Sequence, residues 1–160
     1  MSDKSTDSTR SRPTVLVVDD ALSTRSILEE FFQRSGYNVL QATDPETAFK
    51  RLKTSDVDAI ILDVRLADNR SGLEVLERVR LDERFADLLV IVLTGIRRLE
   101  ASEEELIRRH RAHLLYKGAG YQEVLVQLDR IIRSAGGRGE PRAVATETSR
   151  PVAARSRLVH

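Results

Sequence analysis

The chain has 160 residues, which suits one domain of ordinary size with a short tail to spare. It contains no cysteine, so disulfide bonds, thiolate metal sites and a thiol nucleophile are excluded. The formal net charge is +1, but the excess of basic residues lies at the two ends and the segment between them is mildly acidic, which argues against a nucleic-acid-binding core.

Both ends are expected to lie outside the domain. Residues 1–12 are rich in Ser and Thr and have no apolar residue after Met1, which is typical of a disordered tail. Residues 136–160 show neither strand nor helix periodicity, so we expect a flexible basic tail there and a domain at residues 13–135. Apolar runs are too short to span a bilayer and the first residues do not form a secretory signal, so we expect a cytoplasmic protein without a membrane contact.

Between the tails, short apolar runs alternate with amphipathic segments. Thr14–Val18 is apolar and rich in β-branched residues, as in a buried strand, and Asp44 before Pro45 is typical of a helix N-terminus. The alternation predicts an α/β fold, a doubly wound five-stranded parallel sheet with helices on both faces. In chain order we expect strand 14–18, helix 22–35, strand 37–42, helix 45–52, strand 57–62, helix 73–80, strand 88–93, helix 99–110, strand 113–116 and helix 121–132.

Polar side chains follow four of these strands. They are Asp19 and Asp20 after the first strand, Asp63 after the third, Thr94 after the fourth and Lys117 after the fifth. In doubly wound sheets ligands bind beyond the carboxyl ends of the strands, so we expect these groups to converge there. Neighbouring carboxylates repel one another, and oxygen ligands without His or Cys suit Mg²⁺. An ammonium and a hydroxyl beside them form a cradle for a phosphoryl group, and Asp63 can form an acyl phosphate as a nucleophile.

Four motifs occur in a characteristic order: VLVVDD (15–20), IILD (60–63), VLTG (92–95) and YKG (116–118). Together they resemble the receiver domain of response regulators, the phosphoacceptor partners of histidine kinases in two-component systems. The resemblance covers residues 13–135 and implies a flavodoxin-like fold with strand order 2-1-3-4-5.

The resemblance also implies roles for the residues at the strand ends. Asp63 would be the phosphorylated residue, and Thr94 and Lys117 would contact the phosphoryl oxygens. The implied Mg²⁺ ligands are Asp20, Asp19 directly or through water, Asp63, and the backbone carbonyl of Arg65.

Partners follow from the same resemblance. A histidine kinase or a histidine phosphotransfer protein would donate the phosphoryl group, and a downstream protein would bind the face built from residues 97–135. Residues 136–160 are too few for an output domain and lack aromatic residues, so we expect a single-domain response regulator without specific DNA binding. Such a protein is a phosphoacceptor in phosphorelay signalling and not an enzyme, since it promotes only its own phosphorylation and dephosphorylation.

Some positions depart from the family. Ala67 replaces the usual Pro of the loop after Asp63, and Leu114 replaces the usual aromatic residue of the last strand. Gly118 replaces the Pro after the Lys, so we expect a trans peptide bond there. Arg65 and Ile96 would flank the path of the hydrolytic water, and since neither can act as a general base we expect a long-lived phosphoprotein.

Two other function classes stay open. One is a receiver-shaped scaffold that binds partners without phosphorylation. The other is a phosphatase of the haloacid-dehalogenase type, which also uses an Asp nucleophile after an apolar strand. That chemistry needs a second Asp two residues later, where this chain has Arg65.

Overall fold

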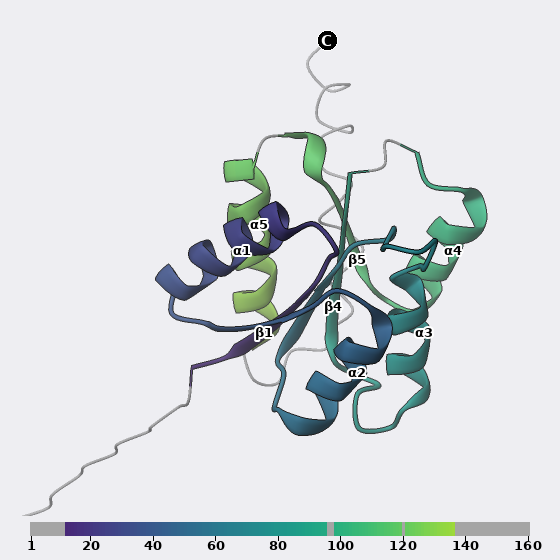
Figure 1. Cartoon of the computed structure of the whole chain (residues 1–160), viewed down its shortest axis with the longest axis horizontal. Coiled ribbons are helices and arrows are strands. Elements are labelled where there is room, and N and C mark those ends of the chain that lie inside the picture. Colours follow the sequence, from purple (N-terminus) through teal and green to yellow (C-terminus); the bar gives the residue numbers. More distant parts are fainter. Residues whose placement is uncertain (1–11, 96–97, 120, 137–160) are drawn as a thin grey trace, which may run out of the picture.

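Five parallel strands form one sheet in the order β2-β1-β3-β4-β5. The computed structural model describes residues 12–95, 98–119 and 121–136 (Figure 1). The strands are β1 (Thr14–Val18), β2 (Asn38–Ala42), β3 (Ala59–Leu62), β4 (Leu89–Thr94) and β5 (His113–Tyr116). The predicted flavodoxin-like strand order is confirmed, with β2 and β5 at the edges.

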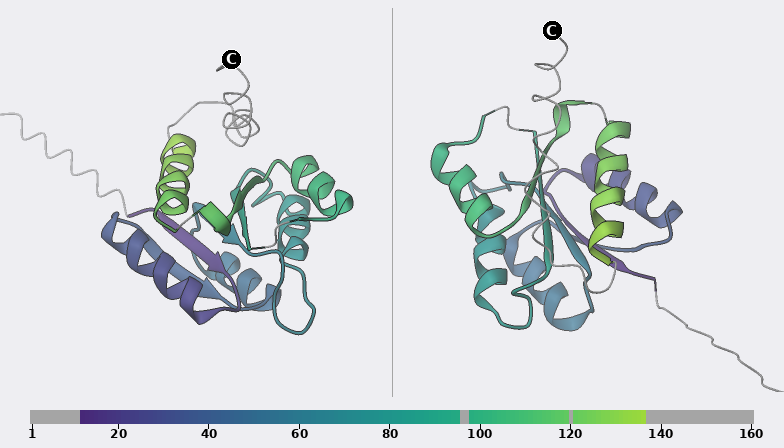
Figure 2. Two further views of the ribbon diagram at one scale, coloured as in Figure 1. Left: turned by 90° about the horizontal axis from the view of Figure 1, so that it is seen from above. Right: turned by 180° about the vertical axis from the view of Figure 1, so that it is seen from behind.

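Helices cover both faces of the sheet (Figures 1 and 2). They are α1 (Leu22–Arg34), α2 (Pro45–Thr54), α3 (Leu73–Leu81), α4 (Ala101–Arg109) and α5 (Tyr121–Gly136), and a short 3₁₀ turn, η1 (Lys117–Ala119), follows β5. α1 and α5 lie on one face, and α2, α3 and α4 lie on the other. This is the two-sided cover expected for a parallel sheet.

Side chains of the central strands alternate between two apolar clusters. Leu16 and Ile60 pack with α2, α3 and α4, whereas Val17 and Ile61 pack with α1 and α5. Successive strand residues point to opposite faces, and here both faces are buried. The strands therefore read as continuous apolar runs. The residues that follow them lie together at the carboxyl ends of the strands, which form one edge of the sheet perpendicular to the edge strands β2 and β5.

Side-chain contacts with the backbone mark the starts of α2 and β3. α2 begins as predicted, because Asp44 Oδ1 accepts the backbone N–H of Thr47 at 2.8 Å. β3 begins at Ala59, later than the expected residue 57. Asp58 instead meets the start of β1, where its carboxylate accepts the backbone N–H of Thr14 at 2.7 Å.

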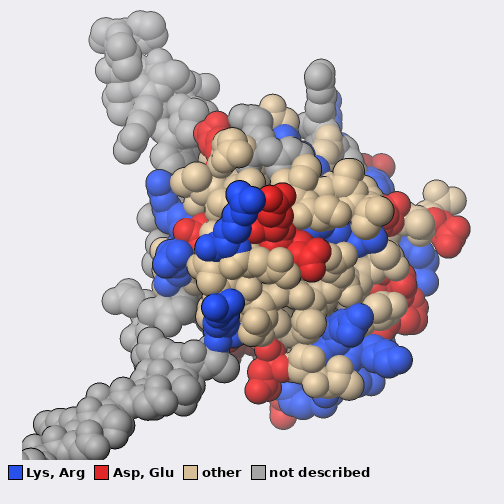
Figure 3. Space-filling view, turned by 60° about the vertical axis from the view of Figure 1, so that its left-hand side comes forward, with Lys and Arg blue, Asp and Glu red and all other residues tan. Residues whose placement is uncertain are grey.

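The charges on the described surface are mixed in sign. Figure 3 shows Lys and Arg side chains interspersed with Asp and Glu on one face. None of the described helices is long and apolar enough to cross a membrane. The expected tails, residues 1–12 and 136–160, fall outside the described residues except at their inner ends, so they stay predictions.

Candidate functional site

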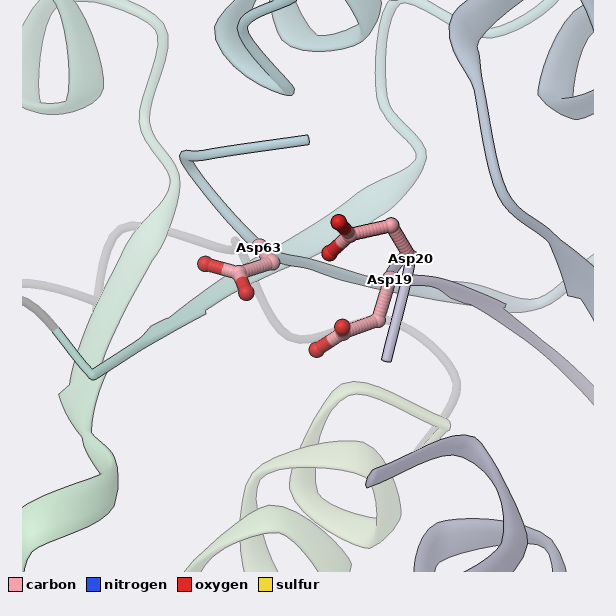
Figure 4. Close-up of side chains that lie close together, drawn as sticks. All are labelled: Asp19, Asp20 and Asp63. Atoms are coloured by element: carbon pink, nitrogen blue, oxygen red, sulfur yellow. The ribbon is translucent and has the colours of Figure 1, made fainter. Parts of the chain in front are cut away.

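Three carboxylates meet at the carboxyl ends of β1 and β3 (Figure 4). The two strands are paired neighbours, and the backbone N–H of Asp63 donates to the carbonyl of Val18 at 2.9 Å. One carboxylate oxygen from each of Asp19, Asp20 and Asp63 lies within 4.8 Å of the other two. Asp19 is buried, Asp63 is half-buried and Asp20 is exposed. The structure thus brings together the three carboxylates that the strand-end pattern singled out.

Lys117 joins two of these carboxylates across the sheet. Its Nζ donates to Asp19 Oδ2 at 2.9 Å and to Asp63 Oδ2 at 3.1 Å. Burial by itself would lower the pKa of Lys117, but the two carboxylates outweigh it and hold the pKa above its usual value. The chain therefore supplies a permanent cation to the site.

One ammonium does not balance the negative charge around Asp63. Burial raises the pKa of Asp63, and the neighbouring charge of Asp19 raises it further, against the opposing effect of Lys117. Asp63 is thus harder to ionise in the folded protein than in the unfolded chain, and a further cation nearby would favour its ionised form. The donors at the site are carboxylate oxygens, which are the ligands that Mg²⁺ prefers.

Thr94 lies at the same edge of the sheet. It is the last residue of β4 and is fully buried, and it pairs with Tyr116, the residue before Lys117. A Cβ added to Gly95 would stand 3.7 Å from Cδ of Lys117, so this turn packs against the Lys stem. All five residues predicted from the strand ends lie at the carboxyl ends of the expected strands: Thr94 is the last residue of β4, and the other four directly follow β1, β3 and β5.

The supports of Asp19 were not predicted. Asp19 Oδ1 accepts the backbone N–H of Ala21 at 2.8 Å, and its backbone carbonyl accepts from Arg25 Nη1 at 2.8 Å. Arg25 Nε in turn donates to Gln41 Oε1 on β2 at 3.0 Å. These contacts tie the turn after β1 to α1 and to the edge strand. The contact of Asp19 with Ala21 is a local turn typical of Asp, whereas the contacts of Arg25 join positions without a common periodicity, so no local sequence pattern indicates those.

Gly72 was also missed as a site residue. It directly precedes α3, and its backbone N–H donates to the carbonyl of Val64 at 2.8 Å. A Cβ at this position would stand 1.8 Å from the backbone carbonyl oxygen of Asp63 and 2.9 Å from Cδ1 of Leu62. Only glycine lets α3 begin directly behind Asp63, which fixes the backbone that carries the carboxylate.

The loop between Asp63 and α3 folds back on itself as a small hairpin, residues 64–72. Its tip is formed by Asp68 and Asn69, whose φ angles of 59° and 56° lie in the left-handed region, as in a tight two-residue turn. Arg70 then donates to Glu46 Oε1 on α2 at 2.8 Å and to Glu74 Oε2 on α3 at 3.0 Å. The hairpin is therefore anchored to two helices.

Of the two residues expected to flank the hydrolytic water, Arg65 and Ile96, the structure describes Arg65. The guanidinium of Arg65 forms an ion pair with Glu103 on α4. Ile96 lies outside the described residues, so the expected long lifetime of the phosphoprotein stays a prediction. The peptide bond before Gly118 is trans, as expected.

Residues 15–128 match the family model of the response regulator receiver domain. The chain belongs to this family, whose members are phosphoacceptor signalling modules that pair with histidine kinases. The described fold and the acidic edge agree with this assignment, and an acidic triad of this kind is typical of the Mg²⁺ site of receivers.

Several relatives show the same likeness. Chemotaxis protein CheY-3 of Vibrio cholerae is 31% identical over 99 residues, which cover 61% of this chain and 72% of the relative. The regulator of alkaline phosphatase synthesis PhoP of Bacillus subtilis is 38% identical over 77 residues, 48% of this chain but 32% of the relative. The chain thus matches about a third of the length of that regulator. The solved structure of Vibrio cholerae CheY4 has 26% identity and a TM-score of 0.65, covering 74% of this chain and 98% of that one.

Replacing Asp63 with Asn is expected to stabilise the protein at pH 7 in EDTA. Folding raises the pKa of Asp63 above its ordinary 3.8, so its stabilising contribution is complete below that value and is lost as the pH rises through the folded pKa. The amide of the variant cannot ionise and avoids this loss. Urea unfolding should show a gain over wild type at pH 7 that shrinks toward pH 4. Asp56→Asn, at an exposed position, is the control. An equal gain in both variants would show that the surroundings of Asp63 do not raise its pKa.

Gly72→Ala is expected to destabilise the fold by about 1–3 kcal/mol, because the backbone of Asp63 or of Gly72 must move to admit the methyl group. Gly118→Ala is the matched control, since its Cβ would meet no atom within 4 Å. Urea unfolding of both variants measures the difference. Equal stability of the two would show that the close packing behind Asp63 is not a constraint.

Proposed function

We propose that Asp63 accepts a phosphoryl group from a phosphohistidine, and that the chain acts as a response regulator. The observation that carries the proposal is the position of the Asp63 carboxylate at the sheet edge, between the Lys117 ammonium and the carboxylates of Asp19 and Asp20. In the transfer a carboxylate oxygen of Asp63 forms a bond to phosphorus while the bond from phosphorus to the donor imidazole nitrogen breaks. The electron pair of that bond stays with the imidazole.

Lys117 and Thr94 are the proposed phosphoryl-binding residues. The Lys117 ammonium lies 3.1 Å from the oxygen that would carry or adjoin the new group, so it can donate to a phosphoryl oxygen without a large movement. Thr94 ends the adjacent strand β4 and offers a hydroxyl at the same edge. Phosphoryl transfer needs little beyond positioning and charge neutralisation, and these groups serve both needs.

The proposed metal ligands are Asp19, Asp20, Asp63 and the backbone carbonyl of Arg65. The closeness of the three carboxylates and the raised pKa of Asp63 fit a hard divalent cation. Bound Mg²⁺ would neutralise the charge that develops on the phosphoryl oxygens. Asp19 also keeps its contact with Lys117, so it orients the ammonium as well as the metal side of the site.

The proposal extends to partners. A histidine kinase or histidine phosphotransfer protein would supply the phosphoryl group, and a protein target would bind the face of residues 97–135. Neither alternative gains support. Membership of the receiver family leaves the phosphatase class without a structural basis, and Arg65 occupies the position where its second Asp would stand. No observation favours a scaffold that works without phosphorylation.

Acetyl phosphate with Mg²⁺ is expected to add one phosphoryl group to the wild type and none to Asp63→Asn, as read by intact mass. Asp68→Asn is the matched control, because it removes an exposed carboxylate from the same loop and should label like the wild type. Labelling of Asp63→Asn at the wild-type level would show that Asp63 is not the phosphoacceptor. No labelling of the wild type, even from a phosphorylated histidine protein, would favour the scaffold.

Removing the metal or one of its ligands is expected to stop labelling while the fold persists. EDTA should abolish it, and so should Asp20→Ala, whose exposed side chain contributes little to packing. Mg²⁺ should raise the Tm of the wild type, because it binds only the folded state, and should not raise that of Asp20→Ala. Asp87→Ala, which removes an exposed carboxylate far along the chain, is the control. Labelling that survives EDTA would refute the proposed metal site.

A further inference from the structure

An ion pair connects the hairpin beside Asp63 to α4. The Arg65 guanidinium, two residues after Asp63, donates through Nη1 to Glu103 Oε1. The Glu103 side chain is 16% exposed and that of Arg65 is 52% exposed, so the carboxylate of the pair is largely shielded from solvent. It joins segments 38 residues apart in the sequence.

Glu103 also caps the helix that it belongs to. Its second oxygen, Oε2, accepts the backbone N–H of Glu100 at 2.9 Å, which forms the return contact of a capping box. The hydrogen bond from Arg65 is the largest cause that holds the pKa of Glu103 below its usual value. A single carboxylate thus links Arg65 to the N-terminus of α4.

The first half of α4 is weakly attached to the body of the domain. None of the side chains of residues 101–105 is buried, and Ile107 is the helix residue that the core encloses. Leu99 anchors the chain just before the helix. Between these two apolar contacts, the ion pair of Arg65 with Glu103 connects α4 to the hairpin.

The negative charges of Glu103 and Asp63 both act on the Arg65 guanidinium, which is hydrogen-bonded to Glu103 and follows Asp63 by two residues in the sequence. The pKa of Arg65 is raised first by its hydrogen bond to Glu103, and also by the charges of Glu100 and Asp63. An acyl phosphate on Asp63 would carry about −1.5 to −2 charges in place of the single charge of the carboxylate, and it would bring three acceptor oxygens. A guanidinium binds phosphate oxygens through parallel hydrogen bonds, so modification shifts this competition away from Glu103.

We propose that Glu103 is a positioning residue for Arg65: it holds the guanidinium on α4 while Asp63 is unmodified, and a phosphoryl group on Asp63 draws Arg65 away and frees the first turn of α4. The proposal rests on the proposed function of Asp63. It makes α4 respond to phosphorylation through a charge-pair exchange and needs no aromatic residue at Leu114.

The first test is the affinity for beryllofluoride with Mg²⁺, an acyl phosphate mimic, measured by calorimetry. Glu103→Gln keeps the cap, because Gln can accept the same backbone N–H, but it loses the charge that competes for Arg65. It should bind the mimic about two- to fivefold more tightly than wild type, the range of an exposed ion pair. In an Arg65→Gln background the same change should have no effect. Glu104→Gln, at the next and exposed position, is the control for general charge.

The second readout is hydrogen exchange in the first turn of α4. The backbone N–H groups of Glu103 and Glu104 both donate to the carbonyl of Glu100 at 3.0 Å. Beryllofluoride should speed their exchange several-fold in the wild type. In Glu103→Gln exchange should already be fast and should not respond to the mimic, because Arg65 no longer holds the helix.

The outcomes separate this proposal from the one it rests on. If the wild type binds beryllofluoride but Glu103→Gln matches it in affinity and exchange, the role of Glu103 is wrong and the phosphoacceptor assignment stands. An equal gain from Glu104→Gln, or a gain that survives in the Arg65→Gln background, also overturns it. If the wild type neither binds the mimic nor takes label from acetyl phosphate, both proposals fail.

Discussion

A shortage of positive charge at the edge of the sheet is the constraint on which the site depends. Asp19 and Asp63 share the ammonium of Lys117, and Asp20 stands within 4.8 Å of both. Burial raises the pKa of Asp63, and the neighbouring charge of Asp19 raises it further against the opposing effect of Lys117. In the proposed function a divalent cation would offset this shortage, and the site could then accept the further negative charge of a phosphoryl group.

Strand pairing brings the charged residues together, and contacts of the surrounding backbone hold them in place. Pairing of β1 with β3 sets the aspartates side by side, and β5 brings in Lys117 from the other half of the sheet. Gly72 lets α3 pack against the backbone of Asp63, and Arg25 fixes the carbonyl of Asp19. The acidic groups are therefore held together despite their repulsion, and a bound cation would relieve that repulsion.

The sequence predicts the convergence of the strand-end residues because parallel strands place their carboxyl ends together, and the resemblance of four motifs supplied the strand order. It does not predict the contacts that surround the site. Arg65 with Glu103, and Arg25 with Gln41, join side chains distant in sequence, and neither pair follows a helical or strand period. The start of β3 depends on a contact of the same kind, since the carboxylate and the backbone N–H of Asp58 both bond to the backbone of Thr14, far away in the sequence.

A crystal structure of the protein with Mg²⁺ and beryllofluoride would show whether the three aspartates and Lys117 bind a metal ion and a phosphoryl group together. We expect beryllium on an Asp63 oxygen, a fluoride accepting a hydrogen bond from Lys117 Nζ, and Mg²⁺ held by the neighbouring aspartates. Beryllofluoride bound to another carboxylate, or Lys117 still bridging Asp19 and Asp63 with no metal at the site, would contradict this expectation.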